Sequence, residues 1–176
     1  LVPLPEAKIS EPVAEAKKTE RPTANAPRYS ISWYVKENNI EKVKQHLKAG
    51  TPVDTITDSD GHTPLICAMH GGYGHAFIEQ ASIIKLLINS GANLNSSNRD
   101  GEMPLHLAAV NDSIEIIKLL ISKGSDINIE SIGENGEVGG LTPLDYTANE
   151  DVRTFIVKNG GKSGVEVAKD NALKGI

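Results

Sequence analysis

The chain has 176 residues, a net charge of −5, a pI near 5.5 and 39% hydrophobic residues. This size predicts one modest domain with a tail, and the acidic balance argues against nucleic acid as the main partner. The single Cys67 excludes an intramolecular disulfide. No apolar run has membrane-spanning length, and no signal-peptide core is visible, so we expect no membrane insertion.

Residues 1–28 place five prolines among Glu, Lys and Ala. Such a composition cannot bury enough apolar surface to fold, so we expect an extended or disordered tail. It is either a tether that holds the domain away from an anchor or a tail without a role of its own. The start at Leu1 rather than Met, together with this composition, favours an exported protein (periplasmic or secreted) over a cytoplasmic one.

Residues 30–54 predict two short helices joined at Asn38 and Asn39 and ended by Gly50. Trp33 falls at a position that a regular hairpin of this kind fills with a smaller side chain. We interpret it as packing at the end of a stack, in preference to a ligand-stacking role.

The next two segments repeat this helical hairpin more regularly. In residues 61–95 and again in residues 100–128, a Pro begins a first helix, an apolar second helix follows, and a Gly ends it. Pro64 pairs with Gly91, and Pro104 pairs with Gly124. A hairpin of two short helices cannot bury its apolar faces alone, so the copies are expected to stack.

The irregularities of the repeats are specific. Seven extra residues fall near positions 73–79, and the turn through residues 131–139 is six residues longer than the period. A fourth copy begins at Thr142 and Pro143, and its second helix is expected to be about three residues short. Residues 165–176 predict either a further short helix or a frayed end.

Gly91 and Gly124 lie 33 residues apart, and this period together with Thr63-Pro64-Leu65 and Pro104-Leu105-His106 resembles the ankyrin-repeat family. The resemblance covers roughly residues 30–163. It implies an all-α solenoid of about four stacked helix-turn-helix repeats with β-turn fingers. We therefore expect a repeat domain over residues 29–164, between the tail and a C-terminal extension of residues 165–176.

In the family, a Thr begins the first helix and a His lies three residues later, but no repeat here has both. The third repeat has His106 with Met103, whose side chain cannot accept the free N–H groups at the helix start. The fourth has Thr142 with Asp145. This departure concerns the rigidity of the stack rather than its formation.

Members of this family generally bind proteins, so the resemblance implies a non-enzymatic interaction module without a cofactor. We expect a monomer that binds a neutral or basic protein, because the implied concave face is mixed to acidic. The contact residues carried over by register, together with aromatic residues of the insertion, are Thr57, Ser59, Asp60, His62, His70, Tyr73, His75, Phe77, Ser97, Arg99, Asp100, Glu102, Val110, Asn111 and Leu141.

The insertion allows two interpretations, because Tyr73, His75 and Phe77 could anchor a partner or fold back onto the neighbouring helix. The alternative function is a small-molecule- or metal-binding accessory protein using Cys67, His70 and His75. However, Cys67 occupies an apolar core position by register, which also disfavours a Cys–His nucleophile. The glycines of residues 71–74 lack the strand and the Lys-Ser/Thr ending of a phosphate loop.

Overall fold

A computed structural model describes residues 28–56, 61–71, 74, 76–132 and 140–174 of the 176. Within these ranges the chain forms eight α-helices and one 3₁₀ helix, and no strand. The expected all-α solenoid of stacked helix pairs is therefore confirmed. None of the described helices is both long and apolar enough to span a membrane.

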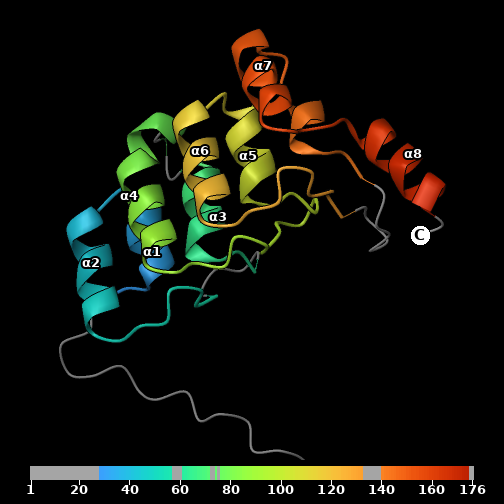
Figure 1. The fold of residues 1–176 in the computed structure, drawn as a ribbon. Coiled ribbons are helices and arrows are strands. Elements are labelled where there is room, and N and C mark those ends of the chain that lie inside the picture. Colours follow the sequence, from blue (N-terminus) through green and yellow to red (C-terminus); the bar gives the residue numbers. More distant parts are fainter. Residues whose placement is uncertain (1–27, 57–60, 72–73, 75, 133–139, 175–176) are drawn as a thin grey trace, which may run out of the picture.

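The first three repeats are helix pairs that stack in two rows (Figure 1). In the inner row α1 packs on α3 and α3 on α5, while in the outer row α2 packs on α4 and α4 on α6. The bounds of the pairs are Ile31–Lys36 and Ile40–Lys48 for α1 and α2, Pro64–Met69 and Phe77–Asn89 for α3 and α4, and Pro104–Val110 and Ile114–Ser122 for α5 and α6.

Local sequence explains where these helices begin and end. Pro64 and Pro104 occupy first-turn positions, where the missing N–H has no intrahelical partner to lose. Gly91 and Gly124 follow the second helices with φ of 85° and 97°, a backbone conformation that costs other residues energy. The Pro at the helix start and the Gly after the helix end that the sequence predicted are thus present in both repeats.

The core lies between the two rows and runs through all four repeats. Each fully buried Leu or Ile contributes about 1.5–3 kcal/mol relative to an exposed one. Side chains at 1% exposure or less come from every repeat and include Val35, Val43, Leu65, Ile83, Leu87, Leu105, Ile116, Leu120 and Ile156.

Aromatic side chains close the N-terminal end of the stack. The rings of Tyr29 and Trp33 are stacked with centroids 4.4 Å apart, and Tyr34 meets Trp33 edge to face at 5.0 Å. His46 Nε2 lies 2.7 Å from the carbonyl oxygen of Tyr29 and ties this cluster to α2. Trp33 packs against the core, as its interpretation as an end cap predicted.

The fourth repeat corrects one expectation. Its second helix, α7 (Glu150–Lys158), has nine residues, as many as α6, so it is not short. The missing residues lie before it: Pro143 and Glu150 are seven positions apart, whereas Pro104 and Ile114 are ten apart. The first helix is therefore reduced to the 3₁₀ helix η1 (Pro143–Tyr146), whose end is stabilised when Arg153 Nη1 donates to two backbone carbonyls.

After α7 the chain forms a last helix, α8 (Gly164–Lys174), of which no residue is buried. It begins where a further finger would follow and lies beyond α7 at the end of the stack (Figure 1). Side chains of earlier repeats fix its start. Asn128 Oδ1 accepts the Lys162 N–H at 2.7 Å, and Asp145 Oδ2 accepts the Gly164 N–H at 2.7 Å.

The insertion in the second repeat lengthens a helix. α4 begins 14 residues before Gly91, whereas α6 begins ten residues before Gly124. The added turn lies against the first repeat, where Gln80 Nε2 donates to the Val35 carbonyl at 2.9 Å and Asn38 Nδ2 donates to the Glu79 carbonyl at 3.3 Å. These two hydrogen bonds join the first turn of α4 to the first repeat.

Candidate binding surface

Two histidines of the second repeat, His62 and His70, lie on the side of the stack that carries the β-turn fingers, which we call the finger side. His62 directly precedes the N-cap Thr63 of α3, and His70 is the C-cap of the same helix. Their rings are stacked, with centroids 5.4 Å apart and planes 18° from parallel. The short helix thus brings together two residues that lie eight positions apart in the sequence.

Asn98 joins this pair to the third repeat. Its amide nitrogen lies 3.3 Å from His70 Nε2 and donates to Glu102 Oε2 at 2.7 Å. Its oxygen accepts the backbone N–H of Glu102 at 2.8 Å, so both ends of the side chain are used. The finger of residues 98–102 is therefore fixed against α3 by one side chain that is only 7% exposed.

The same finger depends on a glycine for its contact with the next one. Gly101 has a φ of 73°, and a Cβ there would lie 1.7 Å from the carbonyl oxygen of Ile132. The Gly101 carbonyl also accepts the N–H of Ile132 at 3.0 Å. A side chain at this position would separate the two fingers.

The electrostatics of the pair favour neutral imidazole at His70. Burial and the neighbouring His62 lower the pKa of His70, while Glu102 and Asp100 act in the opposite direction without cancelling the effect. A neutral ring can accept the Asn98 amide hydrogen at Nε2, whereas a protonated ring cannot. The site is therefore a polar surface that contains both hydrogen-bond acceptors and carboxylates.

Comparison with known proteins agrees with this architecture. The family model described as Ankyrin repeats (3 copies) matches residues 31–131 and 76–165, which together cover most of the chain. The chain belongs to the ankyrin-repeat family. The period, the Pro and Gly positions and the stacked helix pairs of this chain are therefore those of ankyrin repeats.

Three individual proteins are similar to this chain, and each of them is longer than the region that matches. The putative ankyrin repeat protein FPV031 of Fowlpox virus (strain NVSL) is 28% identical over 179 residues, which cover 89% of this chain and 50% of that protein. The inactive serine/threonine-protein kinase TEX14 of Bos taurus is 32% identical over 109 residues, covering 61% of this chain and 7% of that protein. The nuclear factor NF-kappa-B p105 subunit of Gallus gallus is 27% identical over 148 residues, covering 74% of this chain and 14% of that protein. The ankyrin chain described here thus spans half or less of the length of these relatives.

Of the remaining predicted contact residues, some lie at a finger tip or at the end of α5, and others lie outside the described residues. Arg99 and Asp100 are exposed at the finger tip beside Asn98, and Ser97 is half-buried next to it. Val110, 49% exposed, and Asn111 lie at the end of α5. Thr57, Ser59, Asp60, Tyr73 and His75 lie outside the described residues.

Two other predicted residues are placed by backbone and core contacts. Leu141, 53% exposed, precedes the N-cap Thr142 of η1, and its carbonyl oxygen is 3.0 Å from His106 Nε2. Phe77 is half-buried and packs against the core, while its neighbour Ile78 is 81% exposed. The structure therefore brings His62, His70 and Glu102 together, and separates Phe77 from them as a packing residue of α4.

Sequence reasoning did not identify Asn98, although a signal for it exists. The segment Asn98-Arg99-Asp100-Gly101 has the composition of a tight turn, in which an Asn side chain commonly bonds the backbone two or more residues later. The contact of Asn98 with His70, 28 positions away, had no such local signal.

The alternative site at Cys67, His70 and His75 gains no support. Cys67 is 2% exposed, in the core position that its register with Leu107 predicted. His75 lies outside the described residues. Across the described ranges no group of three or more His, Cys, Asp or Glu side chains is arranged to hold a metal ion.

Proposed function

We propose that this ankyrin-repeat chain is a non-enzymatic module that binds a protein partner through its finger side. The observation that carries the proposal is the polar cluster of His62, His70 and Glu102, which the buried Asn98 holds together across the second and third repeats. Ankyrin repeats generally act as protein-interaction modules, and a surface built from two repeats presents a larger area than one repeat can.

Charge and exposure define the partner that this surface suits. Asp100 and Glu102 add two carboxylates to a rim that also holds Arg99, and the lowered pKa of His70 favours its neutral form. We infer a neutral or basic partner surface, because like charges opposite one another cost affinity and slow association. Val110, at the other end of α5 from Glu102, offers an exposed apolar contact on the same row of helices. We propose that the chain acts as a monomer.

Site-specific photo-crosslinking tests the proposal. A photoreactive residue replaces Val110, 49% exposed on the inner row, or Val157, 55% exposed on α7 of the outer row. The two valines have similar exposure, so they form a matched pair. In extract of the source cell, we expect a discrete adduct from position 110 that position 157 does not form.

The identified partner is then titrated against variants of the purified chain. Asp100→Arg is expected to weaken binding at least tenfold, whereas Glu115→Arg on the outer face of α6, where Glu115 is 71% exposed, is expected to leave it unchanged. Equal adducts from both valines, or equal losses from both charge reversals, would contradict binding through the finger side.

A further inference from the structure

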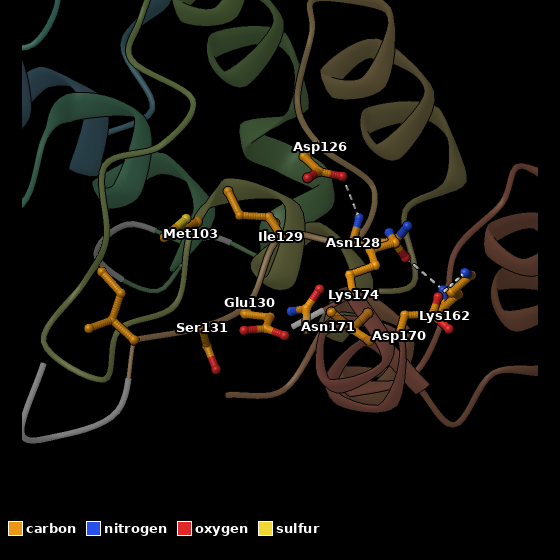
Figure 2. Close-up of a pocket in the computed structure, with 12 residues that line it drawn as sticks. Met103, Asp126, Asn128, Ile129, Glu130, Ser131, Lys162, Asp170, Asn171 and Lys174 are labelled. Atoms are coloured by element: carbon orange, nitrogen blue, oxygen red, sulfur yellow. Dashed lines mark hydrogen bonds and ion pairs between the residues drawn. The ribbon is translucent and has the colours of Figure 1, made fainter. Parts of the chain in front are cut away.

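A groove lies at the C-terminal end of the stack (Figure 2). It is bounded by α8 and by residues 126–132 after α6, which we call the third finger. It has a volume of about 640 Å³, within the range of about 300–1,000 Å³ that is usual for ligand clefts. Its apolar lining comes from Met103, Ile129 and Ile132 on the repeat side and from Val167 on α8. α8 lies almost wholly beyond residue 165, where the match to the family model ends.

The helix that forms this wall has few stabilising contacts of its own. α8 has 11 residues and buries none of them, although isolated helices shorter than about 12–15 residues are marginal in water. Its start is well fixed, since Ser163 and Glu166 cap each other and Asp145 accepts the Gly164 N–H. Beyond that start, Val167 and Asn171 are only half-buried and line the groove. A molecule in the groove would supply the packing that α8 lacks.

The charges are divided between the two walls. Asp126 and Glu130 lie on the finger side, and Lys174 lies on α8 (Figure 2). Lys162 and Asp170 form an ion pair with each other at the end of the groove, so they largely neutralise one another. Among the residues that line the groove, the finger side therefore offers negative charge beside an apolar floor.

We propose that this groove binds an extended peptide segment of a partner protein that carries an apolar side chain and, two positions later, a Lys or Arg. In an extended chain residues i and i+2 point to the same side, so both side chains enter the groove together. The apolar side chain lies between Ile129 and Val167, and the cation pairs with Glu130 and Asp126. This site is separate from the polar surface around His70 and does not depend on it.

A random heptapeptide library displayed on phage tests the proposal with the whole chain as bait. We expect selected peptides to be enriched in an apolar residue followed two positions later by Lys or Arg. With Glu130→Lys, the enrichment in Lys or Arg at that second position is expected to be lost, because the charges of the introduced lysine and of Asp126 on the finger wall then cancel. Glu115→Lys is the matched control on α6 and should select the same peptides as the wild type.

Binding of one selected peptide is then located by amide chemical shifts of the whole chain. Shifts at Glu130, Ile132, Val167 and Asn171, and at least tenfold weaker binding to Val167→Asp, are the expected results. Circular dichroism shows whether each variant remains folded, and Ile132→Ser serves as a second apolar variant if Val167→Asp unfolds. Selection of no peptide, peptides indifferent to Glu130→Lys, or shifts confined to His62, His70 and Glu102 would overturn the proposal.

Discussion

The backbone N–H of Met103 donates to Nδ1 of His106 at 3.2 Å, so the histidine satisfies the N–H of the N-cap residue, while the methionine side chain accepts no N–H of the helix itself. Nε2 of the same ring lies 3.0 Å from the carbonyl oxygens of both Ile129 and Leu141. A neutral imidazole with its hydrogen on Nε2 meets all three groups. One side chain therefore joins α5 to two points of the segment between α6 and η1.

This arrangement predicts a loss of stability on mild acidification. Burial lowers the pKa of His106, and the hydrogen bonds to Leu141 and Ile129 offset only part of that effect. Burial also lowers the pKa of His46. Below a pH of about 6.5 the unfolded chain takes up protons that the folded chain resists, so protons favour unfolding.

We expect the free energy of unfolding, measured with urea, to fall between pH 7.5 and 5.5. The fall is at most about 1.4 kcal/mol per pH unit for each histidine that gains its proton only on unfolding. His106→Gln should be less stable at pH 7.5 but lose less on acidification than the wild type. A wild-type stability that is constant or rises as the pH falls would refute the assignment of neutral histidines.

A second prediction isolates the missing cap at the start of α5. Met103 is 8% exposed, so replacing it removes apolar contacts as well as changing the cap. Thr and Val have nearly the same shape, and Thr63 shows the expected geometry, with its Oγ1 accepting the Ile66 N–H at 3.4 Å. Met103→Thr should therefore be more stable than Met103→Val by about 1 kcal/mol. Equal urea midpoints for the two variants would show that His106 already supplies all the capping that α5 uses.

The sequence predicted the regular repeats because their signals are local. Pro104, Gly124 and the apolar spacing between them act within one helical hairpin, and the family resemblance supplied the way the hairpins stack. The fourth repeat was predicted wrongly, because aligning it shows that three residues are missing but not where. The three residues are missing from the first helix, and Arg153 stabilises the shortened helix by donating to the carbonyls of Leu144 and Thr147.

The candidate surfaces were predictable only where they depend on local sequence signals. His62 and His70 follow from repeat register, whereas the link through Asn98 depends on a contact between repeats. The groove beside α8 could not be predicted, because α8 is placed by Asn128 and Asp145, which lie 34 and 19 positions from their partners. No local pattern in residues 164–174 encodes those contacts.

A third prediction concerns the added turn of α4. Gln80 is fully buried and donates to the Val35 carbonyl, which also accepts the Asn38 N–H, so Gln80→Ala removes one hydrogen bond between repeats together with buried side-chain volume and should cost about 1–3 kcal/mol. Ile78, on the same turn, is 81% exposed, and Ile78→Ala should change stability by less than about 0.5 kcal/mol. Thermal or urea unfolding of the two variants compares them directly. Similar losses from both would mean that the turn does not pack on the first repeat as described.

The last prediction compares one inter-repeat hydrogen bond at the two ends of the stack. Asp54 Oδ1 accepts the Asn93 N–H at 2.9 Å, and Asn128 Oδ1 accepts the Lys162 N–H at 2.7 Å. The acceptors Asp54 and Asn128 each lie four residues after the Gly that ends the second helix of their own repeat. The donors Asn93 and Lys162 each lie two residues after the Gly that ends the second helix of the next repeat. The two contacts are therefore equivalent, but the second also lies directly before α8.

We expect Asn128→Ala to accelerate amide hydrogen exchange in residues 164–174 by about five- to tenfold, since losing about 1 kcal/mol of local stability raises the open population by that factor. Asp54→Ala removes the same kind of bond and should leave exchange in α8 unchanged while increasing it in residues 28–56. Because α8 buries no residue, the segment that enters it must supply much of its stability. Unchanged α8 exchange in Asn128→Ala would show instead that Asp145, through its bond to the Gly164 N–H, is sufficient to hold the helix.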